Sequence, residues 1–253
     1  MKNTFLALAG ILSQLWRIVP APWREKWITG WMILDSRGDS AAGLRQLLGL
    51  RDRLDWVISE RAMVYGGGEH PKHRLTDYHR FFIDNIRNGD RVIDVGCGYG
   101  TVARSIARAY PNCVVVGIDQ DKGRLSQALV ADNPDNLSFI EGDATCALPV
   151  GAWQVVVLSN VLEHIETRID FLKKIKLATL ADRILIRVPL FERDWLMPLR
   201  RELSVNYFSD SDHKIEHTYD EFIEEIKASG LTIITLKTFW GEIWAHCEPI
   251  AIE

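Results

Sequence analysis

Residues 91–109 read RVIDVGCGYGTVARSIARA, which is a short apolar run, a turn with three glycines and a run typical of a helix. Valine and isoleucine that end at a glycine turn predict a buried strand, and the following residues predict a helix. Gly96, Gly98 and Gly100 have no Cβ, so the backbone of this turn can approach a ligand closely. In an open α/β sheet, such a unit predicts a nucleotide-like ligand beyond the carboxyl end of the strand.

The chain on either side continues the alternation of strand and helix. Further strands are predicted at 113–118, 137–141, 154–159 and 183–188, and helices at 100–109, 122–132, 167–180 and 218–229. Their continuous Val, Ile and Leu runs are typical of parallel strands buried on both faces. Two last strands, 231–239 and 243–252, are joined through Gly241 with too little chain for a crossover helix. The predicted fold class is α/β, a mostly parallel sheet with helices on both faces and a C-terminal antiparallel hairpin.

Aspartates at the ends of the first three predicted strands indicate what kind of ligand the turn holds. A dinucleotide-binding turn has a third glycine where this chain has Thr101. Asp94, inside the strand end, repels a pyrophosphate and suits a cationic or amino-bearing ligand. Asp119 ends the second strand, where a carboxylate can accept hydrogen bonds from ribose hydroxyls. Asp143 ends the third, in position to meet the exocyclic amine of a base.

These motifs resemble those of the class I S-adenosylmethionine-dependent methyltransferases, and the small-molecule branch with the ubiquinone-biosynthesis O-methyltransferases is the most similar. VIDVGCGYG resembles the glycine-rich motif, VVGIDQD the ribose-binding acid, FIEGDAT the adenine-side acid and VVVLSNVLEHI the fourth-strand motif. The resemblance implies a Rossmann-like, seven-stranded sheet and S-adenosyl-L-methionine as the methyl donor. It implies these cofactor-binding residues: Asp94, Gly96, Cys97, Gly98, Gly100, Asp119, Gln120, Asp143, Ala144 and Asn160.

The residues after the fourth strand depart from that family's pattern. The ubiquinone enzymes have E-x-x-E-H, sometimes tied to a metal, whereas this chain has Asn160 in the first position and keeps Glu163 and His164. Two ligands do not make a metal site. His213 and His217 from the later loop could join them, but no metal is predicted. His164 and His213 are the candidate catalytic bases, because histidine is the usual proton acceptor near neutral pH. The alternative for His164 is a supporting or helix-capping role.

Two segments before the glycine turn are the other places where function is expected. Residues 1–65 are predicted to be an N-terminal helical extension or lid, and residues 66–253 the methyltransferase domain. Four tryptophans among basic residues (Trp16, Trp23, Trp27 and Trp31) suit either a lid packed on the main domain or a helix in a lipid headgroup layer. An apolar face at Phe5, Leu8, Leu12, Leu15 and Val19 predicts the first helix. Residues 66–79, with three glycines and His70, His73 and His79, either line the site or form a solvated loop.

Composition limits the partners and the compartment. A net charge of −4 provides no general attraction to nucleic acid, so no nucleic-acid partner is expected. Four scattered cysteines indicate neither a disulfide framework nor a zinc knuckle, and a cytoplasmic location is predicted, at the membrane if the headgroup interpretation holds. The predicted activity is methyl transfer to a small-molecule, saccharide or lipid-linked acceptor, with oxygen favoured. A nicotinamide oxidoreductase and a non-catalytic cofactor-binding module that acts with a partner remain the alternatives, and the oligomeric state stays open.

Overall fold

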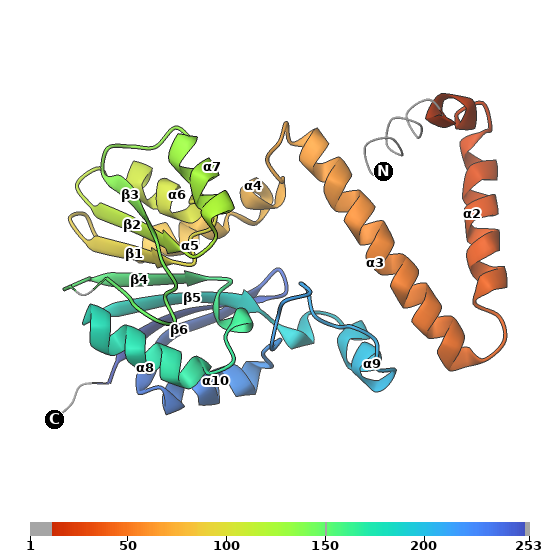
Figure 1. The fold of residues 1–253 in the computed structure, drawn as a ribbon. Helices are drawn as coiled ribbons and strands as arrows, with labels where there is room; N and C mark the ends of the chain where they lie inside the picture. Colours follow the sequence, from red (N-terminus) through yellow and green to blue (C-terminus); the bar gives the residue numbers. More distant parts are fainter. Residues whose placement is uncertain (1–11, 150, 251–253) are drawn as a thin grey trace.

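The computed structural model describes residues 12–149 and 151–250, in which one seven-stranded sheet carries helices on both faces (Figure 1). The strands are β1 (Arg91–Val95), β2 (Val114–Asp119), β3 (Leu137–Glu141), β4 (Val155–Ser159), β5 (Arg183–Pro189), β6 (Leu231–Phe239) and β7 (Glu242–Pro249). The helices are α2 (Ala21–Asp35), α3 (Ser40–Tyr65), α4 (Lys72–Thr76), α5 (Tyr78–Asp84), α6 (Thr101–Ala109), α7 (Lys122–Val130), α8 (Arg168–Thr179), α9 (Leu196–Glu202) and α10 (Tyr219–Ala228), with short 3-10 turns η1 (Leu162–His164) and η2 (Phe191–Arg193). The predicted fold class is confirmed.

The glycine turn follows β1, which is the strand at which the strand order reverses. The order is β3-β2-β1-β4-β5-β7-β6, and β1 pairs in parallel with both β2 and β4. The chain therefore adds strands to one side of β1 first and then to the other, which leaves a crevice at the carboxyl ends of β1 and β4. β7 is antiparallel to β5 and β6, as the short link at Gly241 predicts.

The core consists of two apolar layers, one on each face of the sheet. Every residue of β5 is buried, as the continuous apolar run predicts. On one face α8 and α10 contribute Phe171 and Phe222, and on the other α5 and α6 contribute Phe82 and Ile106. Complete burial of one such side chain is worth about 1.5–3 kcal/mol. The sheet is therefore a rigid frame for the groups at its edge.

The N-terminal helices form an arm beside the sheet domain (Figure 1). Helix α3 is attached to α9, because Arg45 Nε donates to the carbonyl oxygen of Leu203 at 3.0 Å and Arg200 pairs with Asp52 at 2.6 Å. It has 26 residues, about 39 Å of helix at 1.5 Å per residue, and α2 joins it at the end far from the sheet in Figure 1.

The tryptophans of α2 do not pack on the main domain, and that part of the lid prediction is wrong. Trp23, Trp27 and Trp31 are 60%, 47% and 72% exposed, and α2 has no buried residue. The physical reason is that α3 carries α2 away from the sheet. Phe5 and Leu8 of the predicted first helix lie outside the described residues. Within residues 12–149 and 151–250, none of the helices is both apolar enough and long enough to span a bilayer.

Candidate active site

The glycine turn after β1 has the backbone that its sequence predicts. Gly96, Gly98 and Gly100 all have positive φ angles, of 70°, 55° and 69°. A Cβ on Gly96 would lie 2.8 Å from a methyl group of Val161, and one on Gly100 would lie 2.4 Å from the ring of Phe139. The turn is therefore closed in by β3 and by the segment after β4, and side chains at these two positions would push those neighbours away.

Asp119 holds the turn from the neighbouring strand. Its Oδ2 accepts a hydrogen bond from the backbone N–H of Gly98 at 2.7 Å, and its Oδ1 accepts one from Asp121 at 2.8 Å. Each carboxylate oxygen has a second lone pair, so Asp119 can also accept hydrogen bonds from a ligand in the crevice. The residue is 7% exposed, which shields such bonds from water.

Asp94 is the buried carboxyl below the turn. It is 2% exposed, and its Oδ2 has no hydrogen-bond partner among the described residues. Burial and the nearby charge of Asp119 raise the pKa of Asp94 to about 7, against the opposing effect of a hydrogen bond from the backbone of Ala103. A buried acceptor without a donor is costly, so Asp94 is suited to a ligand that brings a cationic or N–H group.

The wall of the crevice is completed by Asp143 and Asn160. The pKa of Asp143 is lowered, first by the Thr145 hydroxyl and then by the Thr145 N–H, which donate to it at 2.7 Å and 2.8 Å. Asn160 has a left-handed backbone with φ of 57°, which asparagine tolerates better than most residues. Its Oδ1 is buried and has no partner within the described part of the chain.

Most of the predicted cofactor residues meet at one small cavity of about 170 Å³. It is lined, among others, by Gly96, Asp119, Gln120, Asp143, Ala144, Asn160 and His164. Asp94, Cys97, Gly98 and Gly100 are not among its lining residues. The Cys97 thiol packs over Gly117 of β2, and burial raises its pKa. Cys97 and Gly100 thus shape the turn.

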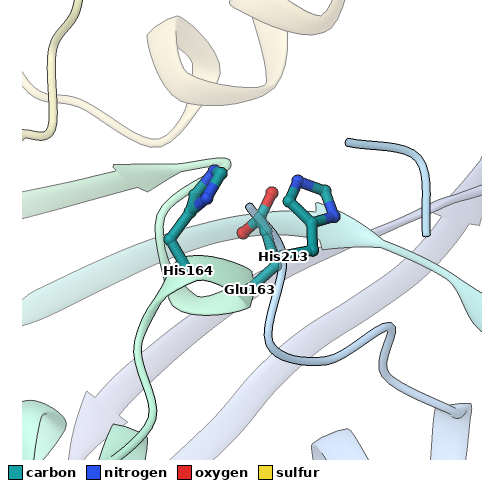
Figure 2. Close-up of side chains that lie close together, drawn as sticks. All are labelled: Glu163, His164 and His213. Carbon is teal, nitrogen blue, oxygen red and sulfur yellow. The ribbon is translucent and has the colours of Figure 1, made fainter. Parts of the chain in front are cut away.

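Glu163, His164 and His213 form a cluster beside this cavity (Figure 2). Figure 2 shows the carboxylate of Glu163 between the two imidazole rings, whose centroids are 4.6 Å apart. Glu163 is fully buried, and both of its carboxylate oxygens lack a hydrogen-bond partner among the described residues. Burial raises the pKa of Glu163 to about 8. At neutral pH this side chain is largely a neutral acid that can donate one hydrogen bond.

The two histidines have opposite protonation tendencies. His164 Nδ1 lies 3.2 Å from Asp212 Oδ2, but burial outweighs that charge and lowers the pKa of His164. For His213, burial acts in the same direction, yet the hydrogen bond to Glu216 at 3.0 Å and the charge of Glu216 outweigh it and raise the pKa. His164 is therefore the better proton acceptor of the two predicted bases, and His213 is the group that tends to be charged.

Glu163 and Glu216 are functional candidates that the sequence reasoning missed. Glu216 accepts hydrogen bonds from Ser209 and His213 and pairs with Arg193, with no exposed side-chain surface. For Glu163, its place next to His164 at a strand end was a usable signal, whereas Glu216 gave none. The ligand atoms of Glu163, His164 and His213 lie within 4.8 Å of one another and could together hold a cation. The predicted absence of a metal stays a prediction.

A second, larger cavity of about 910 Å³ lies next to the histidine cluster, because Ser209 lines it and the Ser209 hydroxyl is 3.4 Å from His213 Nδ1. It lies between α3, α9 and the segment 206–211, and its walls include the aromatic residues Trp56, Tyr207, Phe208 and Trp240. Ser209 and Asp210, which also line it, immediately precede the Asp212 and His213 of the cluster. We call this cavity the acceptor chamber, because we propose below that it holds the methyl acceptor.

Arg187 joins the N-terminal loop to the C-terminal hairpin behind the site. Its guanidinium donates to both carboxylate oxygens of Glu242, at 2.7 Å and 2.5 Å, and to the Ser159 hydroxyl at 3.2 Å. It also lies 3.8 Å from the ring centroid of Tyr78, whose hydroxyl bonds to His73 at 2.8 Å. The loop histidines His70, His73 and His79 line a different groove from the one at His164.

Comparison with known proteins relates the chain to methyltransferases, as the sequence motifs do. Residues 92–179 match the family model described as a methyltransferase domain. Over 81 residues the chain is 38% identical to a ubiquinone biosynthesis O-methyltransferase of Ralstonia nicotianae, covering 30% of this chain and 33% of that protein. It is 30% identical over 88 residues to a trans-aconitate 2-methyltransferase of Streptomyces avermitilis, with 33% of each chain covered. The chain spans about a third of the length of these relatives.

Solved structures show the same fold at low sequence identity. A putative methyltransferase from Haloferax volcanii in complex with the Trm112 methyltransferase activator has a TM-score of 0.60 at 15% identity, over 77% of this chain and 96% of that one. The magnesium protoporphyrin IX methyltransferase of Synechocystis PCC 6803 with bound SAH has a TM-score of 0.54 at 15% identity, over 70% and 83%. These likenesses concern the fold.

Proposed function

We propose that this chain, which belongs to the class I S-adenosylmethionine-dependent methyltransferases, moves a methyl group by direct displacement to a small-molecule, saccharide or lipid-linked acceptor, with oxygen as the methylated atom. The observation that carries the proposal is the meeting of Asp119, Asp143 and Asn160 at one cavity beside the glycine turn, with His164 at its rim. The placement of oxygen as the target rests on His164 and on the names of relatives such as the ubiquinone biosynthesis O-methyltransferase.

The residues present fit S-adenosylmethionine. Asp94 Oδ2 and Asn160 Oδ1 are buried acceptors without a donor in the described chain, and an ammonium group and the hydroxyl or amine groups of a nucleoside are donors. Gly96 has no Cβ, so the backbone of the turn can pack directly against Val161 at the wall of the cavity. When bound, S-adenosylmethionine supplies a methyl group that its sulfonium has already activated.

Each acidic residue has a distinct part in holding the donor. Asp94 would face the methionine ammonium, Asp119 would accept from the ribose hydroxyls, and Asp143 with Ala144 would flank the adenine. The backbone hydrogen bonds that Asp119 and Asp143 already accept fix the direction of their remaining lone pairs. This preorganisation lets the chain place the donor in line with the acceptor, which is the main requirement of a displacement on an activated methyl.

On the acceptor side, His164 would take the proton from an acceptor hydroxyl. Its lowered pKa leaves it neutral and able to accept, and Asp212 at 3.2 Å would stabilise the imidazolium that results. The ring of His213 packs edge-on against that of His164, with 4.6 Å between their centroids, and would hold His164 in position. The aromatic side chains Trp56 and Trp240 of the acceptor chamber, together with its charged residues, suit a saccharide.

A peripheral membrane contact is the proposed role of the N-terminal arm, in an otherwise cytoplasmic protein. Trp23, Trp27 and Trp31 follow one another at four-residue spacing on the exposed surface of α2, with Arg24 and Lys26 nearby. Exposed tryptophans among basic residues suit the headgroup layer of an anionic bilayer. Deletion of residues 1–34 should release the protein from anionic liposomes in a flotation assay. If the full-length chain never floats with them, the arm has another role.

The activity is tested in two steps. Calorimetric titration with S-adenosylhomocysteine should show binding, and NAD should show none; the reverse pattern would favour the nicotinamide oxidoreductase. Incubation of host extract fractions with methyl-labelled donor, followed by mass analysis, then identifies what gains a methyl group. Cofactor binding without any labelled product would favour the non-catalytic module that acts with a partner.

A further inference from the structure

A third cavity lies apart from the acceptor chamber, between the loop that carries α4 and the outer side of α6. It has a volume of about 830 Å³ and includes Tyr99 and Thr101, which belong to the glycine turn and the start of α6. The groove therefore adjoins the cofactor turn at Tyr99 and Thr101. We call it the basic groove.

Its charge differs from that of the chain as a whole. Lys72, Arg74, Arg104 and Arg108 line it against one acid, Glu69, whereas the whole chain has a net charge of −4. Within the described residues, the side chains of Lys72 and Arg74 have no ion pair or hydrogen bond. A concentration of unneutralised cations in a concave site attracts anions.

The two arginines of α6 add to this positive potential. Arg104 and Arg108 lie one helical turn apart, a spacing at which like charges repel. Burial lowers the pKa of Arg104, and the charge of Arg108 lowers it further. Hydrogen bonds to Asn133 at 2.9 Å and to the carbonyl of Tyr99 at 3.2 Å keep Arg104 in place. The pair with Asp132 on exposed surface neutralises Arg108 only weakly.

His79 provides a buried polar atom that lacks a partner. Its Nδ1 lies 2.7 Å from the Ser105 hydroxyl, and its Nε2 has no hydrogen-bond partner among the described residues. Burial, with His73 and Arg187 nearby, lowers the pKa of His79 to about 4, so the ring is neutral. In the tautomer in which Ser105 donates to Nδ1, the ring carries its proton on Nε2 and needs an acceptor, which an anion provides.

We propose that the basic groove binds a phosphate or diphosphate group of the acceptor. The assignment to an acceptor, though not the anion site itself, rests on the proposed methyl transfer. A diphosphate matches the several cations of the groove better than a single carboxylate does. Nucleotide-linked and lipid-linked saccharides both carry this group, so the chemistry is shared and the source is a question for experiment.

The test is calorimetric titration of the full chain with inorganic pyrophosphate at low salt. The double variant Lys72→Gln/Arg74→Gln should bind it at least ten-fold more weakly than the original chain. The control, Lys173→Gln/Lys227→Gln, removes the same charge from exposed positions on α8 and α10 and should bind like the original chain. Equal affinity in all three proteins would overturn the proposal, and so would competition between pyrophosphate and S-adenosylhomocysteine, since the groove would then belong to the cofactor cavity.

Two further titrations separate this inference from the proposed function. S-adenosylhomocysteine should bind all three proteins equally; pyrophosphate binding without it would reject the methyltransferase activity and leave the anion site standing. Uridine diphosphate glucose and farnesyl diphosphate then distinguish a nucleotide source from a lipid source, because the matching one should bind more tightly than pyrophosphate and lose that gain in the double variant. If neither exceeds pyrophosphate, the assignment of the groove to the acceptor is wrong.

Discussion

The two halves of the site are held in place by different means. In the cofactor half, Asp119 and Asp143 accept hydrogen bonds from backbone groups of their own or the adjacent turn. In the acceptor half, His213 is held by Glu216, which in turn pairs with Arg193 from another segment. The cofactor half is thus held by backbone N–H groups of the turns, whereas the acceptor half is held by contacts between side chains.

This difference predicts that substitutions should separate the two halves. A change in the acceptor half should cost stability while the folded molecules still bind the cofactor. A change in the cofactor half should cost cofactor affinity with little loss of stability. The first two of the following four experiments test this separation, and the last two examine the buried acid of one half and the glycine turn of the other. The one with the largest expected effect comes first.

Glu216→Ala should lower the free energy of unfolding by about 3–5 kcal/mol, because it leaves buried charged partners unpaired. Burial alone would raise the pKa of Glu216, but hydrogen bonds from His213 and Ser209 and the charge of Arg193 lower it, so the removed group is an ionised one. Urea unfolding measures the loss. The folded fraction should bind S-adenosylhomocysteine with its original affinity, and the exposed Glu224→Ala serves as the control. A loss of affinity in the folded fraction would show that the halves are coupled.

Asp119→Ala should weaken cofactor binding by roughly 1.5–3 kcal/mol, the scale of hydrogen bonds to a charged group. Calorimetric titration with S-adenosylhomocysteine measures the change, and Asp135→Ala on the exposed surface is the matched control. Unchanged affinity would remove Asp119 from the ribose. A stability loss larger than the affinity loss would mean that its bond to Gly98 matters more than its bond to the ligand.

Glu163→Gln should raise the free energy of unfolding above neutral pH by about 1–2 kcal/mol. The variant no longer has a buried group that must ionise, and this gain exceeds the cost of burying an amide without partners. The pKa of Glu163 is about 8 in the folded protein and near 4.5 when unfolded. Between these values the folded state binds more protons, so the original chain loses stability as pH rises through this window. Urea midpoints at pH 5 and pH 8.5 should converge in the variant; an unchanged pH slope would mean that Glu163 is not the titrating group.

Gly96→Ala should cost about 1 kcal/mol more stability than Gly98→Ala, since both positions have the left-handed backbone but only one has a close neighbour. The new methyl group at Gly96 would meet Val161 at 2.8 Å, whereas nothing lies within 4 Å of a Cβ at Gly98. Thermal unfolding of the two variants provides the comparison. Equal losses would indicate that the cost at both positions is backbone strain alone.

The contrast between the halves also explains what the sequence could predict. The strands and the three aspartates were predicted because an apolar run and the residue at its end are local patterns. Asp143 and Asn160 needed no knowledge of distant segments to be placed at the cavity. Nothing in the residues around Glu216 indicates that Arg193 will reach it, because that contact depends on where η2 packs.

The position of the N-terminal arm also could not be predicted from the sequence. The tryptophan pattern suits either a lid on the main domain or a helix in a headgroup layer, and the exposure of Trp23 and Trp31 disagrees with the first of these. The length of α3 and the position of its attachment to α9 determine where α2 lies. Neither can be obtained from the periodicity of α2 itself.

The contacts of Arg187 show that the segment that matches the methyltransferase family model is shorter than the folded domain. Residues 92–179 match the methyltransferase family model. Of the three side chains that contact the Arg187 guanidinium, only that of Ser159 lies within this segment. Tyr78 precedes that segment, and Arg187 and Glu242 follow it. A gene fragment cut at the limits of the match would lack β5, β6 and β7 and leave the hydrogen-bonding edge of β4 without its partner strand. A gene that encodes this domain therefore has to retain at least the residues from Tyr78 to Glu242 together.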